Sequence, residues 1–237
     1  MRKVCSTPRL LFLVLILGTS SATYAQSSIF NVPSTDVIPR KTFYLEADYL
    51  AHIASYENGG FHYAGPSLIY GVRKNLEIGL NAYYTRAAEP VSAELQPNAK
   101  WQFHNDESRG IAAAVGGVMF IPISHRAAGN TRGMIYGTVS KQFKGTVSPR
   151  FTSGAYSFVG RVESGETRAG LLLGYEQPLN RKLSFVADWY SGRNSFGYSA
   201  AGFGVPLPKN NSLYFGYNFG NAGRGNNYFS LFYAHTF

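Results

Sequence analysis

The chain has 237 residues, a formal net charge of +9 at pH 7 and only 15% charged residues, whereas Tyr, Phe and Gly number 17, 17 and 26. The positive charge is moderate and is not gathered into basic runs interleaved with aromatic residues, so a nucleic-acid partner is not expected. Abundant aromatic residues and glycine with little charge favour β-strands that pair closely and face lipid.

The N-terminus has the three parts of a secretory signal peptide. Three basic residues precede an apolar run at residues 10–17, and a small, polar segment then ends at Ala25, after which cleavage is expected. The run is much shorter than the roughly 20 residues of a membrane-spanning helix. Removing residues 1–25 takes away three basic residues and no acid, which lowers the formal charge from +9 to +6. Cys5, the only cysteine, precedes the run, so neither a lipid-anchored cysteine nor a disulfide is expected in the exported chain.

Residues 26–40 (QSSIFNVPSTDVIPR) contain two prolines and show little periodicity. They predict either a lead-in on the periplasmic side or a small plug that folds back into the lumen. The sequence does not decide between these two alternatives.

From residue 41 onward the chain divides into twelve strand-length segments separated by short turns, and none of them shows a helical period of 3.6 residues. The expected strands are residues 41–55, 61–73, 75–86, 92–104, 109–122, 131–144, 147–160, 166–177, 180–191, 195–205, 211–220 and 227–237. An even number of antiparallel strands is typical of bacterial membrane barrels.

Polar and apolar residues alternate within these segments. In residues 92–104, Glu94 and Lys100 belong to a wholly polar set of alternate positions, while Trp101 and Phe103 belong to the apolar set between them. A soluble sandwich turns such a polar face to water, whereas a membrane barrel turns it to the lumen and the apolar face to lipid. The period alone does not separate these two folds.

The last segment favours the membrane barrel. Phe229, Leu231, Tyr233 and Phe237 occupy alternate positions up to the final residue of the chain. This pattern resembles the C-terminal strand of bacterial outer-membrane β-barrels, which closes the barrel and is read by the barrel assembly machinery. The alternative is an edge strand of a soluble β-protein. Together with the signal peptide, the pattern predicts an all-β, transmembrane antiparallel barrel at residues 41–237.

Two internal phrases extend the resemblance beyond the last strand. These are residues 30–36 (FNVPSTD) and residues 68–80 (LIYGVRKNLEIGL), which accompany the terminal Phe237. With them the whole exported chain resembles small outer-membrane barrels grouped as transporters, including the family named for the meta-pathway of phenol degradation. The resemblance implies a pore-like role and no catalytic residues.

The basic residues predict an orientation and a lipid partner. If the N-terminus is periplasmic, six of the seven lysines after residue 25 lie at the periplasmic rim. The outer end then carries Arg86, Arg126, Arg132, Arg161, Arg193 and Arg224. Guanidinium groups match phosphates bidentately, so lipopolysaccharide and outer-membrane lipids are expected partners. The alternative is that these arginines are solvated loop charges.

Catalytic and metal chemistry find little support. The five histidines are scattered, so a metal site is not expected, and no cofactor motif is present. An outer-membrane lipid hydrolase remains the enzymatic alternative, with Ser124 and His125 at the outer rim. Adjacent residues of a strand point to opposite faces, however, so these two would not pair with each other there.

Function is expected to reside in the lumen. Alternation places nine charged residues there: Glu46, Asp48, Glu77, Glu94, Lys100, Arg132, Arg168, Glu176 and Asp188. Such groups are costly inside a membrane element unless they face water or pair with each other. The sequence therefore predicts a passive channel for small solutes, and its alternative is a structural or adhesion barrel whose lumen is closed by paired charges.

Overall fold

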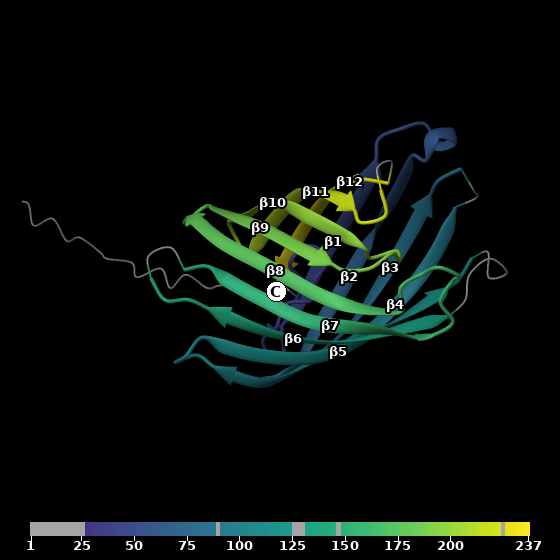
Figure 1. Ribbon diagram of the computed structural model, residues 1–237. Coiled ribbons are helices and arrows are strands. Elements are labelled where there is room, and N and C mark those ends of the chain that lie inside the picture. Colours follow the sequence, from purple (N-terminus) through teal and green to yellow (C-terminus); the bar gives the residue numbers. More distant parts are fainter. Residues whose placement is uncertain (1–26, 89–90, 125–130, 146–147, 224–225) are drawn as a thin grey trace, which may run out of the picture.

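The computed structural model describes residues 27–88, 91–124, 131–145, 148–223 and 226–237. These residues form one closed barrel in which every strand pairs with its neighbours in the sequence and β12 returns to β1 (Figure 1). The strands are β1 (Phe43–His52), β2 (Phe61–Arg73), β3 (Leu76–Arg86), β4 (Ser92–Asp106), β5 (Ile111–Pro122), β6 (Arg132–Gln142), β7 (Arg150–Gly160), β8 (Ala169–Asn180), β9 (Leu183–Tyr190), β10 (Tyr198–Leu207), β11 (Asn211–Gly220) and β12 (Tyr228–Thr236). The twelve expected segments are confirmed.

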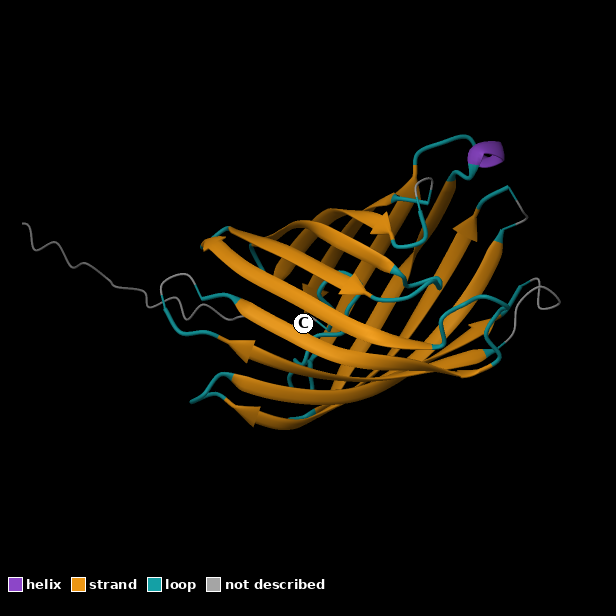
Figure 2. Ribbon diagram, in the orientation of Figure 1, coloured by secondary structure: helices purple, strands orange, loops and turns teal. Residues whose placement is uncertain are grey.

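Strands account for nearly all of the regular structure (Figure 2). A short 3-10 turn, η1 (Tyr56–Asn58), lies between β1 and β2. Within the described ranges, no helix is long and apolar enough to cross a membrane. The predicted signal peptide falls in residues 1–26, which lie outside the described residues.

The barrel closes between its first and last strands. Leu45 pairs with His235 and Tyr49 pairs with Leu231 in an antiparallel register. Beyond the last ladder position, Phe43 and Phe237 exchange two backbone hydrogen bonds of 2.8 and 2.9 Å. Closure leaves no free sheet edge, which is what allows a β-structure to exist in lipid.

The outer face of the barrel is an apolar belt. In β1 the side chains alternate between exposed and buried, as period-two geometry requires. Large exposed apolar residues recur around the wall: Leu45, Tyr49, Leu68, Leu80, Trp101, Met119, Ile135, Val139, Phe151, Leu171, Leu173, Phe215, Phe229, Leu231 and Tyr233. A belt of this extent suits hydrocarbon and not water, so the fold is a transmembrane β-barrel.

The two ends of the barrel differ in their connections. At one end, which we call the turn end, β1 begins, β12 finishes and short turns join β2–β3, β4–β5, β8–β9 and β10–β11, while residues 143–149 connect β6 to β7. In the β10–β11 turn, Lys209 and Asn210 have φ values of 58° and 60°, the positive φ that tight hairpin turns require. The opposite end, the loop end, carries the longer connections, including residues 53–60 and 161–168.

Candidate lumenal site

The N-terminal segment lies inside the barrel. Ser28 and Pro33 form a β-bridge, and Ile29 donates its backbone N–H to the Val32 carbonyl at 2.8 Å, so residues 28–33 make a tight turn. Ile29 and Val32 are 1% and 0% exposed. We call residues 27–40 the plug, because they occupy the lumen between the turn end and mid-barrel. Residues 27–40 therefore fold back among the strands.

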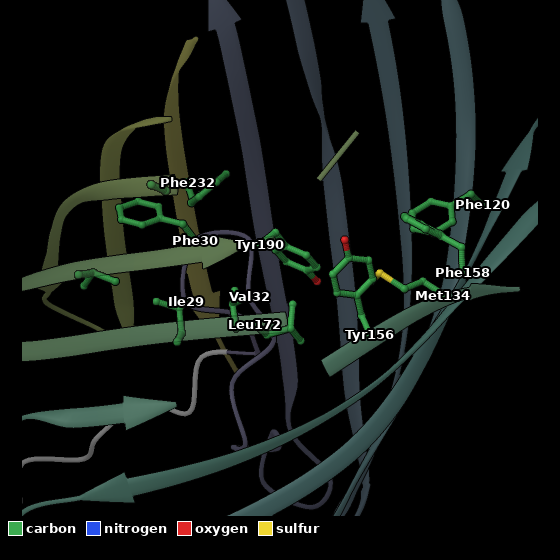
Figure 3. Packing of buried hydrophobic residues seen from close by; sticks show 12 residues of the cluster. Ile29, Phe30, Val32, Phe120, Met134, Tyr156, Phe158, Leu172, Tyr190 and Phe232 are labelled. Atoms are coloured by element: carbon green, nitrogen blue, oxygen red, sulfur yellow. The ribbon is translucent and has the colours of Figure 1, made fainter. Parts of the chain in front are cut away.

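An apolar cluster holds the plug against the wall (Figure 3). The wall contributes side chains from β5 to β10 and from β12: Phe120, Met134, Tyr156, Phe158, Leu172, Val186, Tyr190, Ala200 and Phe232. The Phe30 ring lies 6.0 Å from the Phe232 ring. The expectation of a polar lumenal face is wrong for this part of the wall, because its inward positions are filled with aromatic and aliphatic residues that pack as a core.

Two wall glycines make room for the plug. A Cβ built on Gly174 would lie 2.2 Å from Ile29 Cδ1, and one built on Gly216 would lie 2.7 Å from Phe30 Cζ. Any larger residue at these positions would enter the space that the two plug side chains fill. The glycines therefore shape the seat of the plug.

Asp188 on β9 grips the tip of the plug. Its Oδ2 accepts the backbone N–H groups of Phe30, Asn31 and Val32 at 2.9, 2.6 and 2.8 Å. Three consecutive N–H groups around one oxygen form an anion-binding concavity, which compensates the buried carboxylate. Asn31 also donates to Asn218 Oδ1 at 2.9 Å. The plug thus reaches β9 and β11 near mid-barrel.

A buried ion pair grips both ends of the plug. Lys100 Nζ lies 3.1 Å from Glu77 Oε1, and the two side chains are 2% and 1% exposed. Glu77 accepts the Ser27 hydroxyl at 2.6 Å and the Ile38 backbone N–H at 2.6 Å. Lys100 donates to the Ser27 carbonyl at 2.8 Å. A buried pair is stable only when additional hydrogen bonds satisfy it, and the plug supplies them here.

Arg150 on β7 makes the third polar attachment, and it was not among the residues expected in the lumen. Its guanidinium donates to both carboxylate oxygens of Asp36 at 2.5 and 2.9 Å. Glu176 lies 3.7 Å from Arg150 Nε on the wall side. The alternation of β7, which turns Thr152 and Tyr156 inward, would have placed Arg150 in the lumen.

Glu46 and Asp48 on β1 differ from these attached residues. Tyr44 donates its hydroxyl to Glu46 Oε2 at 2.5 Å, and Tyr83 donates its hydroxyl to Asp48 Oδ2. Asp48 Oδ1 accepts no hydrogen bond from the described residues. Both carboxylates line a cavity of about 210 Å³ whose floor is the plug. We call it the lumenal cavity.

A wider space, the vestibule, opens above the lumenal cavity at the loop end. Its volume is about 770 Å³, and its wall includes Glu94 and Arg132. Arg132 pairs with Glu166 at 3.0 Å and lies over the Phe158 ring at 4.7 Å. Six residues line both spaces and mark where the two meet: Asn31, Leu50, Tyr63, Gln96, Phe120 and Phe196.

The nine expected lumenal charges therefore separate into groups. Glu77, Lys100 and Asp188 hold the plug, and Glu176 contacts the arginine that does so. Glu46 and Asp48 face the lumenal cavity, while Glu94 and Arg132 face the vestibule. Arg168 is exposed just before β8, donates to the Phe158 and Gly160 carbonyls, and lines neither space.

The rim shows little sign of a hydrolytic site. The Ser124 hydroxyl accepts the Ala93 backbone N–H at 2.7 Å and donates to the Val91 carbonyl at 3.5 Å, so it fastens the loop end of β4. His125, its expected neighbour in such a site, lies outside the described residues. The described part of the chain contains no cluster of three or more potential metal ligands.

Solved structures share this fold. An outer membrane channel from Pseudomonas putida F1 matches with a TM-score of 0.52 and 12% identity, over 86% of this chain and 98% of that one. The outer membrane phospholipase A of Escherichia coli matches with a TM-score of 0.41 and 13% identity, over 85% of this chain and 94% of that one. No protein-family model and no curated protein sequence matches the chain.

The first of these matches shows the fold alone, and the second is too distant to support an argument. This chain has the fold of an outer-membrane β-barrel. The resemblance to the meta-pathway of phenol degradation family is not tested by these matches and stays a prediction.

Proposed function

We propose that the protein is an outer-membrane channel for small solutes, with the loop end outside the cell and the turn end in the periplasm. The observation that carries this proposal is the series of two spaces, vestibule and lumenal cavity, which continue each other down the lumen and stop at the plug. Hydrogen bonds, ion pairs and apolar contacts hold the plug, so it can move aside without breaking a covalent bond. The likeness in fold to a bacterial outer membrane channel supports the proposal.

A closed structural or adhesion barrel is the second candidate. The burial of Ile29 and Val32 favours it, because a plug that contributes to the core stabilises the barrel while it stays in place. The two candidates share the resting structure and differ in whether the plug ever leaves. We propose no enzymatic role, since the one described rim residue of the hydrolase hypothesis fastens a loop.

The same proposal includes the surroundings of the barrel. The apolar belt contacts outer-membrane lipids, and the exposed arginines Arg86, Arg161 and Arg193 at the loop end face lipopolysaccharide phosphates. Arg132 is not proposed to contact lipopolysaccharide, because it pairs with Glu166 inside the vestibule. Phe229, Leu231, Tyr233 and Phe237 form the outward face of the closing strand, where the barrel assembly machinery would read them.

Single-channel recording tests the proposal. Protein purified from membranes, and shown to be folded by a shift in gel migration on boiling, is inserted into a planar bilayer. We expect brief, discrete current steps in the wild type and much longer openings in Asp188→Ala, which frees the plug tip. If both folded proteins remain silent, the closed barrel is the better description.

A further inference from the structure

The lumenal cavity contains two buried carboxyl groups with no basic side chain in its lining. Glu46 and Asp48 are 8% and 9% exposed, and none of the described residues that line the cavity is a lysine, arginine or histidine. Other lumenal acids have partners: Glu77 has Lys100, and Asp188 has three backbone N–H groups. Asp48 Oδ1 has no hydrogen-bond donor among the described residues. A buried carboxylate in this state is poised to bind a positive charge.

Aromatic rings also line the lumenal cavity. They are Phe30, Phe120, Tyr190, Phe196 and Phe232, and Phe232 is the cross-strand neighbour of Asp48. The Phe196 ring lies 5.5 Å from the Phe120 ring and 5.5 Å from the Tyr190 ring, so the three form a continuous patch. Aromatic faces attract cations and also accept apolar groups. One molecule with a charged head and an apolar body would therefore satisfy both the carboxyl groups and the rings.

We propose that the lumenal cavity binds a small organic cation, an ammonium or guanidinium group carried on a short apolar or aromatic body. The head lies on Glu46 and Asp48, and the body lies on the aromatic rings. The side-chain oxygens of Gln96 and Asn98, also in the lining, accept the remaining N–H groups of the head. The volume of about 210 Å³ restricts the ligand to a small molecule. The inference rests on the proposed function, because a solute path from the vestibule brings the ligand to this site.

A divalent metal fits the site less well. Calcium takes six to eight oxygen ligands and magnesium takes six in near-octahedral geometry. Two of the four carboxylate oxygens are already occupied by the Tyr44 and Tyr83 hydroxyls. The aromatic rings supply no oxygen ligands for a divalent metal, whereas they can contact the body of an organic cation.

Binding is measured by calorimetry on the purified full-length barrel in detergent, with benzylammonium as the probe and benzoate and Ca²⁺ as comparison ligands. We expect benzylammonium to bind and benzoate not to bind. The double variant Glu46→Gln/Asp48→Asn should bind benzylammonium at least tenfold more weakly. Asp48→Asn alone should account for more of the loss than Glu46→Gln, because Asp48 Oδ1 is the oxygen without a donor. The control Glu107→Gln removes an exposed charge in the β4–β5 turn and should bind like the wild type.

Several results overturn the inference. They are unchanged affinity in the folded double variant, equal binding of benzoate, no benzylammonium binding by folded wild type, and a Ca²⁺ site that depends on the same two residues while benzylammonium does not bind. Uptake of benzylammonium into proteoliposomes is measured in parallel. Binding without uptake, including in Asp188→Ala, rejects the channel and keeps the binding site, whereas uptake without binding rejects the site and keeps the channel.

Discussion

Two regions of the lumen treat buried charge in opposite ways. Around the plug, Glu77, Lys100 and Asp188 are each satisfied by protein groups, most of them on the plug. In the lumenal cavity, Glu46 and Asp48 face open space and have only hydroxyl donors. Buried polar groups whose hydrogen bonds are all satisfied by the protein make the structure rigid. Groups that lack such partners can still bind a ligand reversibly. The region filled by the plug therefore determines when the lumen is closed. The lumenal cavity determines which ligands the lumen binds.

Removing the grip on the plug tip should have the largest effect. In Asp188→Ala the N–H groups of Phe30, Asn31 and Val32 lose their shared acceptor, at roughly 1–3 kcal/mol for each buried donor left unpaired. We expect the plug to leave its seat for a much larger fraction of the time. The measurement is maleimide labelling of a Val32→Cys reporter, which is usable because Cys5 is the only cysteine in the sequence. The rate should rise at least tenfold.

The matched variant for that experiment is Asp188→Asn. It keeps one oxygen that can accept the three N–H groups, so its labelling rate should fall between those of the reporter alone and Asp188→Ala. Labelling that is equally slow in all three proteins would mean that the apolar contacts of Ile29, Phe30 and Val32 hold the plug without Asp188.

Breaking the buried ion pair sharpens the contrast between the two regions. Lys100→Met leaves Glu77 buried without a cation, which costs roughly 3–5 kcal/mol in typical cases. We expect a lower midpoint for thermal unfolding, followed by the shift in gel migration, and partial recovery in Glu77→Gln/Lys100→Met. Glu46→Gln, in the lumenal cavity, should leave the midpoint unchanged or raise it. A large loss in Glu46→Gln would erase the distinction between the two regions.

A single methyl group added to the wall should displace the plug while every charged residue is kept. Gly174→Ala places a Cβ 2.2 Å from Ile29 Cδ1, and overpacking of this kind costs roughly 1–3 kcal/mol. Labelling of the Val32→Cys reporter should rise several-fold while the barrel stays folded. The control is Gly137→Ala, whose nearest neighbour, Val115 Cγ1, is at an ordinary contact distance of 3.8 Å. Equal labelling in the two variants would show that Ile29 simply adopts another rotamer.

The sequence predicted the barrel because the barrel depends on local, periodic information. Strand length, turn residues and the alternation in segments such as residues 92–104 define twelve strands, and the apolar run to Phe237 marks the closing one. The lining of the lumen was harder to predict, because β5 to β8 carry apolar residues on both faces. The inward ones include Phe120, Phe158 and Leu172, and the outward ones include Val115, Val159 and Leu171. Alternation cannot identify the inner face when both faces have the same chemistry.

The plug could not be placed for a different reason. Its contacts join residues that are far apart in the sequence, such as Asn31 with Asp188 and Asp36 with Arg150. No short sequence motif predicts contacts between residues that are so far apart in the chain. Arg150 has the inward parity of β7, but its role depends on Asp36, which is far away in the sequence. The need for glycine at positions 174 and 216 can be explained only when Ile29 and Phe30 are known to lie against them.

The smallest expected effect concerns two arginines that alternation placed together in the lumen and the structure separates. Arg132 lines the vestibule, where it pairs with Glu166 and donates to the Ser195 hydroxyl at 2.8 Å, whereas Arg168 is exposed and donates only to backbone carbonyls. Arg132→Gln removes a positive charge beside the solute path and should move the reversal potential in a salt gradient toward cation preference. Arg168→Gln should leave the reversal potential unchanged and alter stability by less than about 0.5 kcal/mol. If the two substitutions shift the potential equally, the path at the loop end runs past Arg168 as well, and the vestibule is wider than the structure implies.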